Sequence, residues 1–407
     1  MSVASDKSML RSSRRSILWI VFVFAALLSL IIAVWRPRDF FPAWLAASMW
    51  PWSVCVGALA LRLILVLTGG RWGVGSLPWL NGIVRLLPLT AVLFLPWAFG
   101  LHQLYSWTDP SAFAGLENVE HRQWYFQPWF VIARTVGYFA LWSVLSVLAT
   151  GLPRFRSPFS SDRHSKSIAI PGGQALAGLG LVALLVSVTW AAMDWVMSLD
   201  PYFMSTLFGA LVGMGAMLCG LSMLVALYCS SETVAEVART FGDSDVDAKP
   251  PKLSASSATE DAALPDLANL LLAFVMLWAY LSFSQFLIMW SGDLPIEASF
   301  YEPRSHGLWY YVTLAVTLGG FAIPFCCLMS HDFKRSRRKV GTLAVCLLFV
   351  RIVELWWMIV PHSMEHAMRF NWALIPTAVL MICGWLLIAG GQSGLRPSVR
   401  SEGDGNG

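Results

Sequence analysis

The sequence predicts an all-α polytopic membrane protein with ten transmembrane helices. Of its 407 residues, 57% are hydrophobic and 13% are charged, whereas soluble domains carry about 25% charged residues. The hydrophobic residues form runs of roughly 20 residues, the length at which a helix crosses a bilayer, and barrel strands are far shorter. This composition excludes a water-soluble globular enzyme and a disordered protein. The small net charge of +4 argues against nucleic-acid binding.

Ten such runs follow one another along the chain. They cover residues 16–35, 44–68, 83–106, 128–150, 172–195, 203–229, 267–290, 307–330, 340–361 and 370–391. Residues 16–230 are therefore predicted to hold the first six helices, and residues 267–391 the last four. Between them, residues 231–266 are rich in Ser, Asp, Ala and Pro and predict a flexible linker, because this composition cannot bury a core.

The distribution of Lys and Arg predicts that both termini lie in the cytoplasm. With the N-terminus inside, nineteen Lys and Arg residues fall in the inner segments and five in the outer loops, which follows the positive-inside rule. The tails 1–15 and 392–407 and the linker 231–266 are then cytoplasmic. We expect the protein in the inner (cytoplasmic) membrane of a bacterium. The first helix lacks a small-x-small cleavage site and is expected to stay uncleaved.

The histidines and cysteines predict no redox cofactor in this chain. All seven histidines lie in loops or near the ends of the apolar runs, whereas haem b is held between histidines deep in facing helices. The seven cysteines form no C-x-x-C pattern, so they predict neither an iron–sulfur cluster nor covalent haem. We expect no metal site and no covalently bound cofactor.

Ionisable residues inside the apolar runs are the candidates for function, because charge at such depth is costly unless it is paired or hydrated. The candidate site consists of His102, Arg134, Asp194, Arg351 and Glu354, which the topology places from the middle of the bilayer outward. Arg351 and Glu354 are three residues apart on one helix and can pair. The group predicts a connected proton path or a quinone pocket. The alternative is a static ion-pair network that only holds helices together.

Asp200 has a structural interpretation. An Asp followed by Pro201 is typical of a helix N-cap with proline in the first turn, so Asp200 is predicted to begin the sixth helix. Asp194 lies at the end of the preceding run and has no such role. It is therefore the better candidate for proton chemistry.

Five stretches spread over most of the chain resemble the NrfD/PsrC-like (polysulfide-reductase-type) family of membrane subunits. They are residues 68–107, 127–143, 191–215 (AAMDWVMSLDPYFMSTLFGALVGMG), 270–301 (LLLAFVMLWAYLSFSQFLIMWSGDLPIEASFY) and the eighth and ninth helices up to Pro361. Within this family the chain looks like the second such subunit of alternative complex III, a bacterial quinol:cytochrome c oxidoreductase. The first helix, the linker and the C-terminal tail carry no recognisable resemblance.

The resemblance implies two four-helix bundles, made of the second to fifth and the sixth to ninth helices and flanked by the first and tenth. It implies an integral subunit of a respiratory complex that contributes quinone or menaquinone binding, a proton path, or both. The implied partners carry the haems and iron–sulfur clusters. They are an iron–sulfur subunit, c-type cytochrome subunits and a second membrane subunit of the same family. Such a chain is not expected to be catalytic alone.

Two other functions fit the sequence. A secondary transporter can have ten helices, but transporters usually show internal repeats, and none is clear here, although Pro324 interrupts the eighth helix. A purely structural membrane anchor predicts that charge removal at Asp194 and Glu354 leaves turnover intact. Isolation together with haem-containing partners would favour the oxidoreductase, and solute uptake by a haem-free protein would favour the transporter.

Overall fold

The computed structural model is all-helical, and nine helices within the described residues are long and apolar enough to cross a membrane. The structure describes residues 2–69, 72–109, 124–151, 173–200, 202–230, 255–292, 299–363 and 371–391. The all-α prediction is confirmed, and the nine helices support a multi-pass membrane protein. The tenth predicted run coincides with a shorter apolar helix, α17 (Leu374–Gly391).

The remaining helices follow the order of the predicted runs. The spans are α1 (Ser2–Trp35), α2 (Pro37–Thr68), the interrupted pair α3 (Trp72–Val84) and α4 (Leu87–Phe99), α7 (Pro128–Gly151), α8 (Gly173–Trp195), α9 (Phe208–Ser230), α11 (Ala255–Gly292), α13 (Gly307–Thr317) continued by α14 (Ile323–Met329), and α16 (Arg337–Ser363). The short elements are α5 (Leu101–Leu104), η1 (Ser106–Thr108), η3 (Met197–Leu199), η4 (Glu302–Arg304) and α15 (His331–Arg335).

Two predicted boundaries are wrong. The membrane-spanning part of α1, Arg15–Trp35, agrees with the predicted run 16–35, and the helix itself extends back to Ser2. α11 begins at Ala255, inside the predicted linker, whose residues 231–254 lie outside the described part of the chain, as does the tail 392–407. The third span covers 76–99 rather than 83–106, since it includes the second half of α3 and ends with α4 at Phe99.

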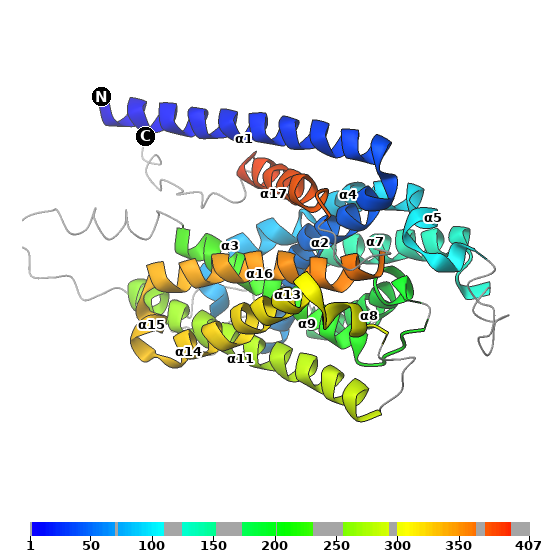
Figure 1. Cartoon of the computed structure of the whole chain (residues 1–407). Helices are drawn as coiled ribbons and strands as arrows, with labels where there is room; N and C mark the ends of the chain where they lie inside the picture. Colours follow the sequence, from blue (N-terminus) through cyan, green and yellow to red (C-terminus); the bar gives the residue numbers. More distant parts are fainter. Residues whose placement is uncertain are drawn as a thin grey trace, which may run out of the picture.

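Helices α2 and α9 form the centre of the molecule. Most residues of both are buried, and α2 packs against α9, α16, α17, α4, α3 and α8. Helix α1 instead packs mainly on α17, and the two lie together along one side of the molecule (Figure 1). A helix that is apolar all round has no preferred buried face. Small residues therefore decide which helices approach most closely.

The closest approach of α2 and α9 depends on two glycines. A Cβ atom added to Gly57 would lie 1.9 Å from the Ala216 carbonyl oxygen, and one added to Gly220 would lie 2.5 Å from the Ala58 nitrogen. Lipid gives helices no hydrophobic reason to associate, so close packing of small residues supplies much of the attraction between them. These glycines therefore fix the position of α9 against α2.

The substitution Gly57→Ala is expected to lower the free energy of unfolding by about 1–3 kcal/mol, because the backbone of α9 must move away. The matched control is Gly137→Ala on α7, where an added Cβ atom would meet nothing within 4 Å. Removing a glycine from a helix interior there should stabilise the protein by up to about 1 kcal/mol. Thermal unfolding in detergent measures both effects. Equal melting temperatures for the two variants would contradict this packing.

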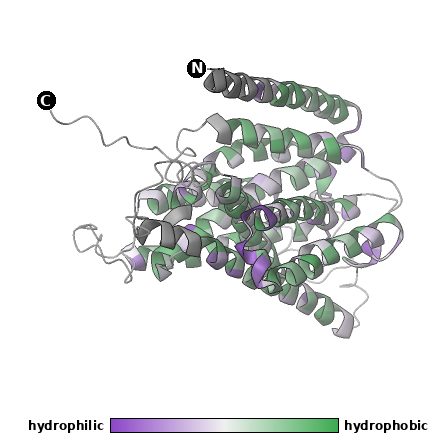
Figure 2. Ribbon diagram, turned by 90° about the vertical axis from the view of Figure 1, so that its left-hand side faces the viewer, coloured by the Kyte–Doolittle hydropathy of each residue, from purple (hydrophilic) through white to green (hydrophobic). Residues whose placement is uncertain are grey.

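The outer surface is apolar. Large hydrophobic side chains such as Ile20, Phe24, Val147 and Phe283 are more than half exposed. Figure 2 shows that hydrophobic residues predominate on the helices, including those on the outside of the molecule. Soluble monomers rarely expose continuous apolar patches of this kind, so the surface supports contact with lipid.

A π-helical turn, η5 (Leu318–Ala322), joins α13 to α14. Pro324 has no N–H to donate to the carbonyl four residues earlier, so the helical ladder opens at this point. A Cβ atom added to Gly320 would lie 3.0 Å from the Trp278 ring of α11. Helix α11 packs against η5 and α14 and then diverges from α13 toward its own C-terminal end (Figure 1). This divergence makes room for the pocket described below.

Candidate functional site

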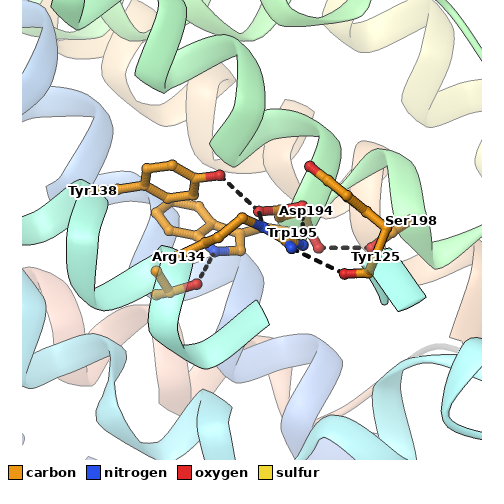
Figure 3. Close-up of polar contacts among 7 residues, drawn as sticks. Tyr125, Arg134, Tyr138, Asp194, Trp195 and Ser198 are labelled. Atoms are coloured by element: carbon orange, nitrogen blue, oxygen red, sulfur yellow. Dashed lines mark hydrogen bonds and ion pairs between the residues drawn. The ribbon is translucent and has the colours of Figure 1, made fainter. Parts of the chain in front are cut away.

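Arg134 of α7 and Asp194 of α8 form a buried bidentate ion pair (Figure 3). Arg134 Nε donates to Asp194 Oδ2 and Arg134 Nη2 donates to Oδ1, each at 2.9 Å. Tyr138, one turn after Arg134, donates its hydroxyl to Oδ2 at 2.8 Å. The Asp194 side chain is 0% exposed and the Arg134 side chain 14%. Both carboxylate oxygens therefore have partners.

Aromatic and backbone groups complete the surroundings of Arg134. Its Nη1 donates to the Tyr125 carbonyl oxygen at 2.9 Å, and its guanidinium lies 3.8 Å over the Tyr125 ring and 4.5 Å over the Phe130 ring. Burial and the neighbouring charge of Asp194 raise the pKa of the Tyr125 hydroxyl to about 12, so Tyr125 is neutral at physiological pH. These contacts hold the guanidinium in one position.

The residue after Asp194 anchors this end of α8 in the core. Trp195 Nε1 donates to Thr135 Oγ1 at 3.0 Å, and the Trp195 carbonyl accepts a hydrogen bond from the Tyr105 hydroxyl at 2.8 Å. The Trp195 ring packs against a set of aromatic rings from α2, α4 and α7, namely Trp52, Phe94, Phe139 and Trp142. A rigid, fully bonded ion pair in such a setting is typical of a structural role.

A second ion pair lies on α16. Arg351 Nη1 donates to Glu354 Oε2, and Trp278 Nε1 of α11 donates to Glu354 Oε1 at 3.0 Å. Both charged side chains are 3% exposed, so the predicted pairing of these two residues is confirmed. Arg351 lies against Gly215 of α9, where an added Cβ atom would be 2.1 Å from Nη2. Only a glycine leaves room for the guanidinium there.

A pocket of about 790 Å³ lies beside Glu354, between α11, α13 and α16. Buried residues form its inner wall, among them Phe208, Trp278, Gln285, Arg304 and Glu354. Exposed residues of the membrane-spanning helices form its rim, among them Met276, Tyr280, Phe283 and Tyr310. Because the rim lies on the apolar outer surface, the pocket opens onto that surface. A largely apolar lining with a few polar groups is typical of sites for small lipophilic ligands.

Arg304 lies in the wall of the pocket, just before α13. Its Nε donates to the Trp357 carbonyl oxygen and its Nη2 to that of Met358, both at 2.8 Å. Its Nη1 donates to the Phe300 carbonyl oxygen and lies 3.1 Å from His362 Nε2. Burial lowers the pKa of Arg304 to about 9, so it stays protonated at neutral pH. The groups that accept its hydrogen bonds are neutral, and the nearby Asp200 carboxylate, 3.9 Å from His362 Nδ1, offsets part of its positive charge.

The prediction that Asp200 begins the sixth helix is wrong, because α9 begins at Phe208. Asp200 lies directly after η3, and Pro201 is outside the described residues. The Asp200 carboxylate accepts hydrogen bonds from the Tyr202 backbone N–H at 2.9 Å and from the Ser299 hydroxyl at 2.6 Å. An Asp side chain that bonds the backbone two residues later makes a turn, not a helix cap. Asp200 thus ties two connecting segments together.

The five candidate residues come together only as two pairs. Arg134 joins Asp194 and Arg351 joins Glu354, but no hydrogen bond or ion pair between described residues links one pair to the other. His102 is exposed on α5 and has no such contact with another described residue. The contacts among the described residues therefore do not form one connected polar path through all five.

The sequence interpretation missed Tyr138, Gln285 and Arg304. The predicted site consists of Asp, Glu, Arg and His residues inside apolar runs, which leaves out the hydroxyl of Tyr138 and the amide of Gln285. Gln285 does carry a signal, because an amide in the middle of a membrane span needs a partner. Arg304 lies in a predicted loop, and nothing in its neighbourhood predicts burial. Only the packed helices reveal it.

The pocket and the two ion pairs are the sites on which a function can be based. Within the described part of the chain, no group of three or more His, Cys, Asp or Glu residues could hold a metal ion. Comparison of the chain with protein-family models and with curated proteins finds no match.

Proposed function

We propose that the chain is an integral membrane subunit of a respiratory quinol:cytochrome c oxidoreductase, and that the pocket between α11, α13 and α16 binds quinone. The observation that carries this proposal is the form of the pocket, which opens onto the apolar outer surface and is apolar at its rim, with few polar groups on its buried wall. A quinone has an apolar tail and a small polar head, and it reaches its sites through the lipid. A hydrated solute would instead require a polar entrance.

The proposed family is the NrfD/PsrC-like one, with α2–α8 and α9–α16 as its two bundles. The position of α1 and α17, packed together beside the other helices, supports this arrangement. So does the pairing of α2 with α9, the first helices of the two proposed bundles. The partners would be an iron–sulfur subunit, c-type cytochrome subunits and a sister membrane subunit.

Glu354 is the proposed proton acceptor. Oxidation of a quinol to a quinone releases two electrons and two protons, so the site needs a base for the protons and a route for the electrons. Glu354 lines the pocket, whereas Asp194 does not. The electrons would pass to redox centres of the partner subunits. We assign the Arg134–Asp194 pair to the stability of the helices.

Purification of the full chain from its native membranes, through an affinity tag and in mild detergent, tests the proposal. We expect c-type cytochromes and an iron–sulfur protein to co-purify, as seen by a redox difference spectrum and by mass spectrometry. The chain expressed without these partners should show no haem bands and no quinol oxidation. A haem-free protein that transports a solute would overturn the proposal in favour of a transporter.

A further inference from the structure

Gln285 has an unused hydrogen-bond donor on the wall of the pocket. Its side chain is 1% exposed, and its Oε1 accepts a hydrogen bond from the Ser205 hydroxyl. Its Nε2 has no hydrogen-bond partner among the described residues. Native structures almost always give a buried amide its partners, because leaving one unsatisfied is costly. Since Gln285 lines the pocket, a ligand there can supply the missing acceptor.

The position of Gln285 along α11 shows how far its unused Nε2 donor lies from Glu354. Trp278, which bonds to Glu354, precedes Gln285 by seven residues on α11. At 1.5 Å per residue this corresponds to about 10 Å along the helix axis. Gln285 therefore lies nearer the end of the pocket formed by the 299–305 segment, where Arg304 adds a buried positive charge.

We propose that Gln285 holds the head of the quinone by donating a hydrogen bond from Nε2 to one of its carbonyl oxygens. The inference rests on the proposed function for the identity of the ligand. The two oxygens of a quinone lie on opposite sides of the ring, so a ring held at Gln285 directs its second oxygen along the pocket toward Glu354. The tail then leaves between α11 and α13, past Met276 and Phe283, which are exposed at the rim.

The charge of Arg304 favours the same placement. Its N–H groups already bond to backbone carbonyls and contact His362, so it acts on the ligand through its field and not through a further bond. Asp200 offsets part of this charge, and the positive potential that is left on the pocket side stabilises an electron-rich oxygen in a low-dielectric site. The polar head of the ligand is thus favoured at the Gln285 end, and the tail at the rim.

The test compares quinone binding by Gln285→Leu with that of a matched control, Gln103→Leu, which changes an exposed glutamine of α5 outside the pocket. The purified preparation, with whatever partners it retains, is placed in lipid nanodiscs. The probes are menaquinone-4, decylubiquinone and a hydrocarbon of matched size that lacks the two oxygens. We expect Gln285→Leu to weaken quinone binding about tenfold and to leave hydrocarbon binding unchanged. Gln103→Leu should change neither.

Gln285→Glu covers the case in which the leucine variant does not fold. It keeps the size of the side chain and an acceptor for Ser205, and at a pH where the new carboxyl is ionised it has no donor for the quinone, so we expect the same tenfold loss there. Equal losses for quinone and hydrocarbon, or no loss for quinone, would overturn the inference. So would a wild-type pocket that binds neither quinone, or one that retains a phospholipid which quinone cannot displace. The haem content of the same preparation reports separately on the proposed function.

Discussion

When Asp194 is replaced by alanine, we expect most of the folded protein in the membrane to be lost, because the variant is no longer stable. The substitution leaves the Arg134 guanidinium without its two charged hydrogen bonds and the Tyr138 hydroxyl without an acceptor. Breaking a buried ion pair by removing one partner costs about 3–5 kcal/mol, out of a typical total stability of about 5–15 kcal/mol. The yield of monodisperse protein after size-exclusion chromatography and its melting temperature measure the effect.

Two milder variants separate structure from proton transfer at this pair. Asp194→Asn keeps the shape and one acceptor but removes the titrating charge, and we expect a lower yield with unchanged turnover per haem. Tyr138→Phe removes a single hydrogen bond and should cost about 1 kcal/mol. A normal yield of Asp194→Asn with at least tenfold lower turnover would contradict the structural role. That result would place Asp194 in a proton path.

Replacement of Glu354 by glutamine is expected to lower quinol-dependent turnover at least tenfold in an assembled complex, which corresponds to about 1.4 kcal/mol of activation free energy. Glutamine keeps the size of the side chain and can still accept the hydrogen bond from Trp278. It cannot take up a proton from the ligand. The rate of cytochrome c reduction by quinol, normalised to haem content, measures the change.

The buried partner of Glu354 requires its own control, because Glu354→Gln leaves Arg351 without a counter-charge. The double variant Arg351→Met with Glu354→Gln removes both charges, which is often neutral for stability. We expect it to recover the yield of the complex but not the turnover. Full turnover in an assembled Glu354→Gln complex would show that this carboxylate takes no part in proton transfer.

The helices could be predicted from the sequence because a bilayer demands long, continuous apolar segments. The boundaries that failed are those where hydropathy does not decide. Helix α11 begins at Ala255 inside a Ser- and Asp-rich stretch, where no apolar run marks its start. The third span is interrupted between α3 and α4, so its ends are not marked by one continuous apolar run.

The candidate site was predictable only where the contacts are local. Arg351 and Glu354 lie three residues apart, so their pairing follows from helix geometry. Arg134 and Asp194 lie sixty residues apart, and no sequence pattern selects them as partners. Asp200 was misassigned because an Asp–Pro pair suits a turn as well as a helix cap. The pocket depends on how α11 diverges from α13, which is decided by tertiary packing around η5.

The central claim is that quinol oxidation depends on this chain, and its most direct measurement is quinol-driven reduction of cytochrome c. The rate is compared between membranes that contain the wild-type chain and otherwise identical membranes from cells in which it has been deleted. We expect the rate to fall to background without the chain and to return when the wild-type chain is supplied, but not when Glu354→Gln is supplied. An unchanged rate in membranes that lack the chain would contradict the claim.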